Sequence, residues 1–163
     1  MTQTMITSGN VATNRKAHFN YEILETLVAG IVLTGGEVKS LRAGHATINE
    51  SYAAFERDGG LYLINMHIMD YGAAKGGFVK QVASRPKQLL SRKKELKHIH
   101  DELAKKGKTV VPLDLFFNPR GLAKVKIAIA RGKNTIDKRE TIKKRDWNIE
   151  KRRILAHYNN GKR

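Results

Sequence analysis

The 163-residue chain has no cysteine. It therefore cannot build a disulfide framework or a Cys-ligated zinc or iron–sulfur site, and its fold must be held by packing alone. It also has no run of about 18 consecutive apolar residues, which a transmembrane helix requires, and its polar start lacks the hydrophobic segment of a secretory signal. From these absences we expect a cytoplasmic protein that does not associate with membranes.

Acidic residues are few, because 15 Asp and Glu stand against 31 Lys and Arg and the net charge is +16. A charge of this size attracts polyanions over long distances, so nucleic acid is the expected partner. The imbalance is strongest from Gly132 onward, where eleven Lys and Arg accompany four Asp and Glu. We expect residues 133–163 to be a basic tail that is disordered when free. Apolar residues at roughly helical spacing favour a helix on binding over an arm with no register.

Local patterns divide the rest of the chain. The first 13 residues are polar and without periodicity, which indicates a flexible leader. Residues 21–33 are rich in β-branched side chains and predict a strand that bends or bulges at Gly30. A short helix follows, with Thr34 as its N-cap and Gly44 just beyond its end.

Two hairpins and a second helix complete the prediction. The first hairpin turns at Asp58-Gly59-Gly60, and the Gly- and Ala-rich residues 71–77 suggest a surface loop. A helix is predicted from Pro86 to Lys106. The second hairpin turns at Asn118-Pro119-Arg120-Gly121. The strand before the turn has alternating apolar residues on one face: Val111, Leu113, Leu115 and Phe117. In the strand after it, Lys124 and Lys126 alternate with the apolar residues Val125, Ile127 and Ile129.

Short antiparallel strands with interposed helices indicate a mainly β fold. We expect residues 14–132 to form a closed or partly open antiparallel barrel of the oligonucleotide-binding type, with flanking helices.

Enzyme signatures are weak. Residues 30–37 have the glycine spacing of a phosphate-binding loop but lack its lysine. His67 and Asp70 could form an acid/base pair after a strand, although this spacing arises often by chance. The histidines are scattered. We therefore expect no catalytic activity, no metal site and no cofactor.

Polar and basic residues recur along the predicted domain and could line one side of the barrel. Any one of them could be an ordinary solvated residue, but the positive excess extends over the whole body and favours phosphate contacts. The candidate RNA-binding residues are Asn14, Arg15, Lys16, Lys39, Arg42, Lys124, Lys126, Arg131 and Lys133.

Several stretches together resemble one family. Asn14-Arg15-Lys16-Ala17, Glu37-Val38-Lys39-Ser40-Leu41-Arg42 and the run from Asp137 to Asp146 are similar to the SsrA-binding proteins (small protein B) of bacterial trans-translation. The resemblance extends from about Asn14 to Tyr158. The chain departs from the family pattern at Val28, Ser91 and Ile136, so no role is carried over to these positions.

The resemblance implies an oligonucleotide-binding-like fold and a non-enzymatic function. Proteins of this family bind the transfer-RNA-like domain of transfer-messenger RNA (tmRNA), which arrives at a stalled ribosome with elongation factor Tu and GTP. The protein then stands in the decoding centre, and its tail senses the vacant messenger-RNA channel. We expect the chain to act as a monomer. The tail residues that match the family are Asp137, Lys138, Arg139, Ile142, Lys143, Lys144, Arg145 and Trp147. The alternative is a ribosomal or ribosome-associated structural protein that binds RNA constitutively.

Overall fold

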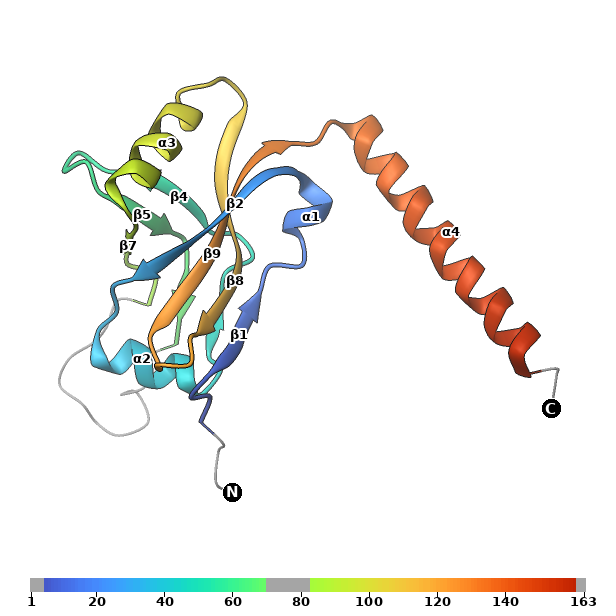
Figure 1. Ribbon diagram of the computed structural model, residues 1–163, viewed down its shortest axis with the longest axis horizontal. Helices are drawn as coiled ribbons and strands as arrows, with labels where there is room; N and C mark the ends of the chain where they lie inside the picture. The colour runs from blue at the N-terminus through green and yellow to red at the C-terminus, as the bar shows by residue number, and fades with distance from the viewer. Residues whose placement is uncertain (1–4, 70–82, 161–163) are drawn as a thin grey trace. The chain divides into compact units, whose positions relative to one another are not determined.

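The computed structural model describes residues 5–69 and 83–160. The chain divides into two compact units between Gly132 and Lys133. The first unit, here called the body, contains all strands and three helices of the described residues, and the second contains one long helix (Figure 1).

The body is built on an antiparallel sheet whose strand order is β1-β8-β4-β5-β7-β2-β9, with β8 and β9 also paired. Six strands therefore close into a ring, and β1 adds to the outer edge of β8. This ring-like sheet confirms the mainly β fold. Its strands are β1 (Gly9–Thr13), β2 (Tyr21–Ile31), β4 (Tyr52–Phe55), β5 (Leu61–Ile64), β7 (Lys87–Leu90), β8 (Lys108–Phe117) and β9 (Ala123–Gly132).

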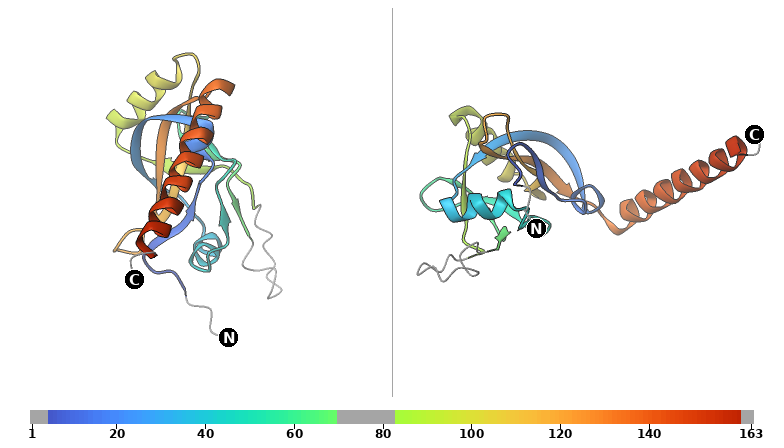
Figure 2. Two further views of the ribbon diagram at one scale, coloured as in Figure 1. Left: turned by 90° about the vertical axis from the view of Figure 1, so that its right-hand side faces the viewer. Right: turned by 90° about the horizontal axis from the view of Figure 1, so that it is seen from below.

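Smaller elements flank the ring. Strands β3 (Ala46–Thr47) and β6 (His67–Ile68) pair with each other, and α1 (Ala17–Asn20) precedes β2. Helices α2 (Gly35–Arg42) and α3 (Lys93–Leu103) lie at opposite ends of the sheet (Figures 1 and 2).

The main core combines apolar side chains from strands around the ring. Leu61 and Leu63 of β5, Leu89 of β7 and Ile127 of β9 are all at most 2% exposed. Alternation in β9 is as predicted, because Val125, Ile127 and Ile129 are buried while Lys124 and Lys126 are only half-buried.

A β-bulge in β8 contradicts the predicted alternation of that strand. The register with β9 shifts between Pro112 and Asp114. An extra residue in one strand moves the following side chains to the other face. Leu115 and Phe117 therefore join the main core, whereas Val111 and Leu113 join a second apolar cluster that contains Ala17 of α1.

Two boundaries also differ from the prediction. Residues 9–13 are not part of a flexible leader, because β1 pairs with β8 from Gly9–Phe117 to Thr13–Asp114 and so satisfies backbone groups along its edge. The predicted helix begins at Lys93 rather than after Pro86, because residues 87–90 form β7. The predicted loop at 71–77 lies outside the described residues.

The register shift of β2 lies between Ile23 and Glu25 and not at Gly30, where we predicted a bend or bulge. The following local predictions are confirmed. Thr34 and Glu37 form a capping box in which the Thr34 backbone N–H donates to Glu37 Oε2 at 2.8 Å and the Glu37 N–H donates to Thr34 Oγ1 at 3.4 Å. Gly44 beyond α2 has a φ of +80°. The β4–β5 hairpin turns at Gly59, whose φ is +77°, and Asp58 Oδ1 accepts a hydrogen bond from the Gly60 N–H at 2.9 Å.

The second unit is a continuous helix, α4 (Thr135–Asn160), where we expected an unstructured tail. Its local sequence explains the helix. Lys, Arg and Glu are good helix formers, and Asp137 in the first turn accepts a hydrogen bond from the Asn134 N–H at 3.3 Å. Trp147 is 70% exposed and Ile142 is 44% exposed, so α4 has no core of its own. None of the helices in the described part of the chain is long and apolar enough to cross a membrane.

Candidate nucleic-acid interface

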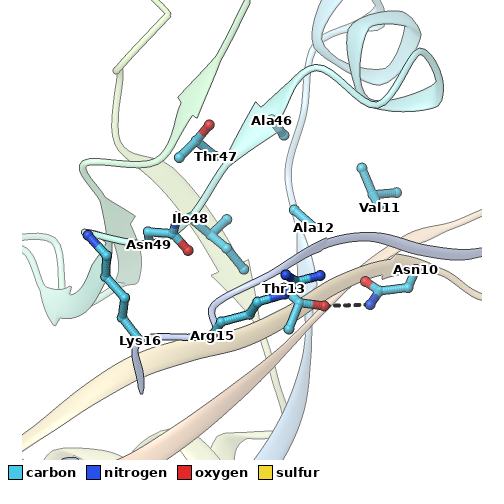
Figure 3. A pocket seen from close by; sticks show the side chains of 10 residues that line it. All are labelled: Asn10, Val11, Ala12, Thr13, Arg15, Lys16, Ala46, Thr47, Ile48 and Asn49. Atoms are coloured by element: carbon cyan, nitrogen blue, oxygen red, sulfur yellow. Dashed lines mark hydrogen bonds between the residues drawn. The ribbon is translucent and has the colours of Figure 1, made fainter. Parts of the chain in front are cut away.

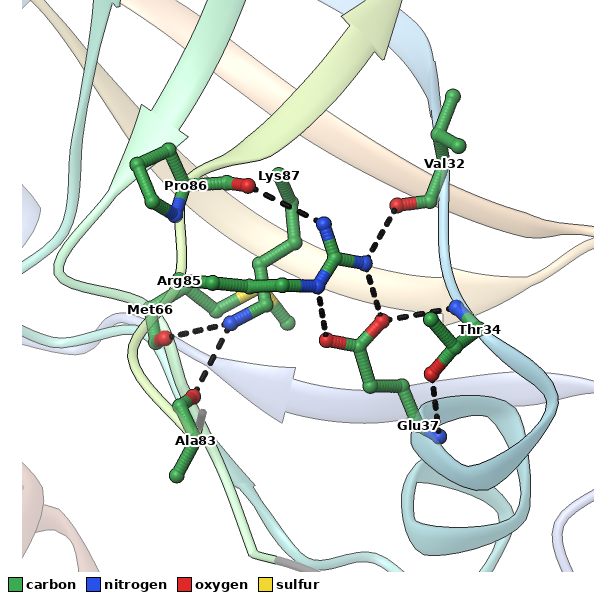
Figure 4. Close-up of polar contacts among 8 residues, drawn as sticks. All are labelled: Val32, Thr34, Glu37, Met66, Ala83, Arg85, Pro86 and Lys87. Carbon is green, nitrogen blue, oxygen red and sulfur yellow. Dashed lines mark hydrogen bonds and ion pairs between the residues drawn. The ribbon is translucent and has the colours of Figure 1, made fainter. Parts of the chain in front are cut away.

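Helix α2 is held to the body by its buried side. Glu37 is 3% exposed and accepts hydrogen bonds from Arg85 Nε at 2.9 Å and Nη2 at 2.5 Å (Figure 4). Ser40 Oγ donates to the Met69 carbonyl at 2.5 Å. These contacts fix the helix, while Lys39 on its other side is exposed. A rigid helix therefore presents Lys39 to solvent.

A buried lysine lies beside this ion pair. Lys87 is fully buried, and its Nζ donates to the carbonyls of Met66 and Ala83, both at 3.0 Å (Figure 4). Burial lowers the pKa of Lys87 to about 8, against the opposing effect of Glu37. Its role is to tie β7 to Met66 and Ala83. The sequence offered no signal for this role, because Lys87 stands in a segment that we had read as helix.

Arg42 at the end of α2 is only half-exposed. Its guanidinium carbon lies 5.7 Å from the centre of the Phe117 ring, within the range of a cation–π contact. Its Nε is buried and has no hydrogen-bond partner among the described residues. Arg42 therefore joins α2 to the end of β8, and it is less accessible than Lys39.

The basic residues of β9 lie in two places. Lys124 and Lys126 occupy the outer face, where Lys124 is opposite Gly30 of β2 and Lys126 is opposite Asp114 of β8. Arg131 is exposed near the other end of the strand, opposite Glu22. The Ala residues between them, Ala128 and Ala130, are buried in the second cluster, so the predicted basic face is interrupted.

Lys133 belongs to the second unit rather than to the body, and its Nζ donates to Thr141 Oγ1 at 3.3 Å. This contact is therefore made within the second unit.

Asn14 is 3% exposed, so it is not the open surface residue that the prediction suggested. Its Nδ2 donates to the Pro112 carbonyl at 3.1 Å, and its backbone N–H donates to the Leu113 carbonyl at 2.7 Å. Its Oδ1 is buried without a hydrogen-bond partner among the described residues. The exposed residues Arg15 and Lys16 follow it and line a pocket of about 620 Å³ (Figure 3).

The candidate tail residues all lie on α4. Lys138 is half-exposed and the others are exposed. Asp137 has a structural role that sequence reasoning missed, because it accepts a hydrogen bond at the helix start. The signal was an acidic residue three positions after Asn134. Lys143, Lys144 and Arg145 give the middle of the helix a strongly basic character.

The catalytic alternative gains no support from the geometry. His67 is exposed on β6, and Asp70 lies outside the described residues. Within residues 5–69 and 83–160, no three or more His, Asp or Glu side chains are grouped so that they could hold a metal ion. His98 instead lies 2.7 Å from Glu25 on the surface.

Comparisons with known proteins cover both units. A family model described as SmpB protein matches residues 11–157. The SsrA-binding proteins of Brucella canis and Brucella abortus are each 54% identical to this chain over 145 residues, which is 89% of the chain and 90% of the relative. A solved structure described as "tmRNA-SmpB: a journey to the center of the bacterial ribosome" is 47% identical, covers 76% of this chain and 85% of its own, and has a TM-score of 0.62. On these matches, the chain belongs to the SmpB protein family.

Proposed function

We propose that this chain is an RNA-binding factor of trans-translation that binds the transfer-RNA-like domain of tmRNA and accompanies it to stalled ribosomes. The observation that carries the proposal is its 54% identity with SsrA-binding proteins over 89% of its length. The description of the similar solved structure names tmRNA, SmpB and the bacterial ribosome, and this supports the same partners. A net charge of +16 provides the attraction to RNA that this function needs.

The body binds the RNA through cations on rigid elements, of which Lys39 is exposed and Lys124 is half-buried. Lys39 projects from a helix that Glu37 and Arg85 hold in place, and Lys124 projects from the outer face of a central strand. Contacts of this type go to phosphates, and they fix the position of the RNA without reading its sequence. The affinity should therefore depend steeply on salt concentration.

The second unit senses the state of the ribosome. Helix α4 carries exposed basic residues along its length and no buried apolar core, so an anionic surface is its natural environment. Its site is the messenger-RNA channel of a stalled ribosome, which a helix can enter only when no message fills it. Elongation factor Tu with GTP delivers the complex, and the protein acts as a monomer in the cytoplasm.

The test removes the chain from Asp137 onward and measures two properties. Binding of the truncated protein to the transfer-RNA-like domain should stay close to that of the full chain, because the body is a separate compact unit. Peptide tagging on ribosomes stalled at the end of a message should be lost. If RNA binding and tagging fail together, the assignment of separate roles to the two units is wrong.

A second comparison separates this function from that of a ribosomal structural protein. The full chain is incubated with ribosomes whose message either ends at the decoding site or continues beyond it. A rescue factor should load mainly onto the first kind. Equal loading onto both would support constitutive binding and contradict the proposal.

A further inference from the structure

Arg85, just before β7, joins three segments of the body through its guanidinium. Its Nε and Nη2 donate to the two carboxylate oxygens of Glu37 at 2.9 and 2.5 Å (Figure 4). Nη2 also donates to the Val32 carbonyl at 3.5 Å, and Nη1 donates to the Pro86 carbonyl at 3.2 Å. Arg85 therefore links the first turn of α2 to the end of β2 and to the start of β7.

Glu37 needs a positive partner because it is only 3% exposed. Its Oε2 also accepts a hydrogen bond from the Thr34 N–H at 2.8 Å, but this donor carries no net charge. A buried carboxylate that loses its cationic partner is strongly unfavourable, since nothing replaces the water it gave up on folding. Without Arg85, Glu37 would therefore turn toward solvent, and the first turn of α2 would move with it.

Lys87 lies close to the same carboxylate but is directed elsewhere. The charge of Glu37 raises the pKa of Lys87 against the larger effect of burial, so the two groups attract each other. The Lys87 Nζ, however, donates to the carbonyls of Met66 and Ala83, both at 3.0 Å (Figure 4). These bonds hold the segment from which Arg85 extends, while the guanidinium of Arg85 bonds to both oxygens of Glu37.

A shift of the first turn of α2 would also displace Lys39. Residues two positions apart on a helix point about 200° away from each other, so Glu37 faces the body while Lys39 faces solvent. Any movement that brings Glu37 to the surface carries Lys39 away from its present position. A phosphate contact made by Lys39 therefore depends on Arg85.

We propose that Arg85 is a positioning residue for RNA binding, which acts through Glu37 and does not itself contact the RNA. Its side chain is 34% exposed and cationic, so the simple alternative is that it makes one more phosphate contact. This inference rests on the proposed function and adds to it a residue outside the candidate RNA-binding set. The two readings of Arg85 differ in what the charge of Glu37 does when Arg85 is absent.

The first test compares Arg85→Met with the double variant that also carries Glu37→Gln. Both are made in the full chain, and affinity for the transfer-RNA-like domain is measured well below the thermal midpoint of each. Arg85→Met should bind about tenfold more weakly, the equivalent of one charge-assisted hydrogen bond. The double variant should recover most of this loss, because a neutral amide can stay buried while its oxygen accepts from the Thr34 N–H.

A direct phosphate contact by Arg85 predicts the opposite result. The double variant would then bind as weakly as Arg85→Met, because both lack the cation, and this outcome would overturn the inference. Arg57→Met at the β4–β5 turn is the matched control. Arg57 is exposed and its replacement makes the same change in charge, so its RNA affinity should stay close to that of the wild type.

The second test is a double-mutant cycle with Lys39→Gln. If Arg85 acts by placing Lys39, then Arg85→Met should cause less than about a twofold further loss of RNA affinity in the Lys39→Gln background. Losses that add in full would show that the two cations contribute independently, and the inference would be wrong.

Arg85→Lys decides the question if Arg85→Met does not fold. Lysine keeps the charge but cannot bond both oxygens of Glu37 in the fixed geometry of a guanidinium. The positioning role predicts RNA binding about threefold weaker, whereas wild-type affinity with wild-type salt dependence would contradict it. Failure of the wild-type chain to bind the RNA domain at all would instead contradict the proposed function.

Discussion

The buried ammonium of Lys87 makes the stability of the body depend on alkaline pH. In the unfolded chain its pKa is the usual 10.5, whereas burial lowers the folded-state pKa to about 8. Between these two pH values the unfolded chain keeps a proton that the folded chain has lost. Since the unfolded state binds more protons, stability must rise with pH in this interval. The cost of burying the charge is fully present below pH 8.

The size of this effect follows from the two pKa values. Between pH 7 and pH 9.5, the contribution of Lys87 to the free energy of unfolding should increase by about 2 kcal/mol. Lys87→Met removes the titrating group. At pH 7 it also removes the cost of the buried charge, while it takes a donor from the Met66 and Ala83 carbonyls at a cost of about 1–3 kcal/mol for each. These effects largely offset each other at pH 7, and only the loss of the donor remains at high pH.

The assay is urea unfolding at pH 7 and pH 9.5, followed by circular dichroism of the sheet. The variant should have a stability close to that of the wild type at pH 7 and be about 2 kcal/mol less stable, relative to the wild type, at pH 9.5. Lys94→Met on the surface of α3 is the control and should follow the wild type at both pH values. If Lys87→Met and the wild type differ by the same amount at both pH values, the lysine does not carry a buried charge.

Three further predictions concern the RNA face, acid stability and α4. Lys39→Gln should weaken RNA binding and reduce the slope of log affinity against log salt concentration by about one. The same substitution at an exposed lysine of α3 should leave the slope unchanged. If the two variants change the slope equally, the RNA does not bind at Lys39. Hydrogen bonds from Lys105 and Lys108 lower the pKa of Glu102 to about 2. Glu102→Gln should therefore reduce the free energy of unfolding at pH 6 but not below pH 2. Urea unfolding of the variant and the wild type under the two conditions measures this difference. Ile142→Pro should break α4 and abolish peptide tagging without loss of RNA binding. Circular dichroism should show that helix content is lost. If this variant tags peptides as well as the wild type does, the helix has no role in tagging.

Elements that depend on neighbours in the sequence were predictable. The capping box of α2 joins Thr34 to Glu37, and the β4–β5 turn depends on Gly59. Both use side-chain and backbone preferences that act within a few residues. The helical spacing of apolar residues in the tail likewise indicated a helix, although we expected it to form only on the partner.

Elements that depend on distant residues were not predictable. Strand β1 forms because the edge of β8, about a hundred residues later, offers hydrogen-bonding groups to residues 9–13. The bulge at Leu113 reverses the face of the residues before it, and the pattern of apolar residues contains no sign of it. Lys87 became a buried donor because β7 pairs between β5 and β2. The position of a strand, a bulge or a buried lysine in this body therefore depends on strand pairing and closure of the ring, not on local propensity.

The charge, the candidate cations and the resemblance to a family follow from the sequence alone, because they depend only on which residues are present and in what order. Which of the candidates reach solvent depends on the folded arrangement of the strands and helices. Arg15 and Lys39 are exposed. Arg42 is half-buried against Phe117, and Asn14 is buried against Pro112. Exposure depends on which strands and helices pack together, and those contacts join residues up to about a hundred positions apart.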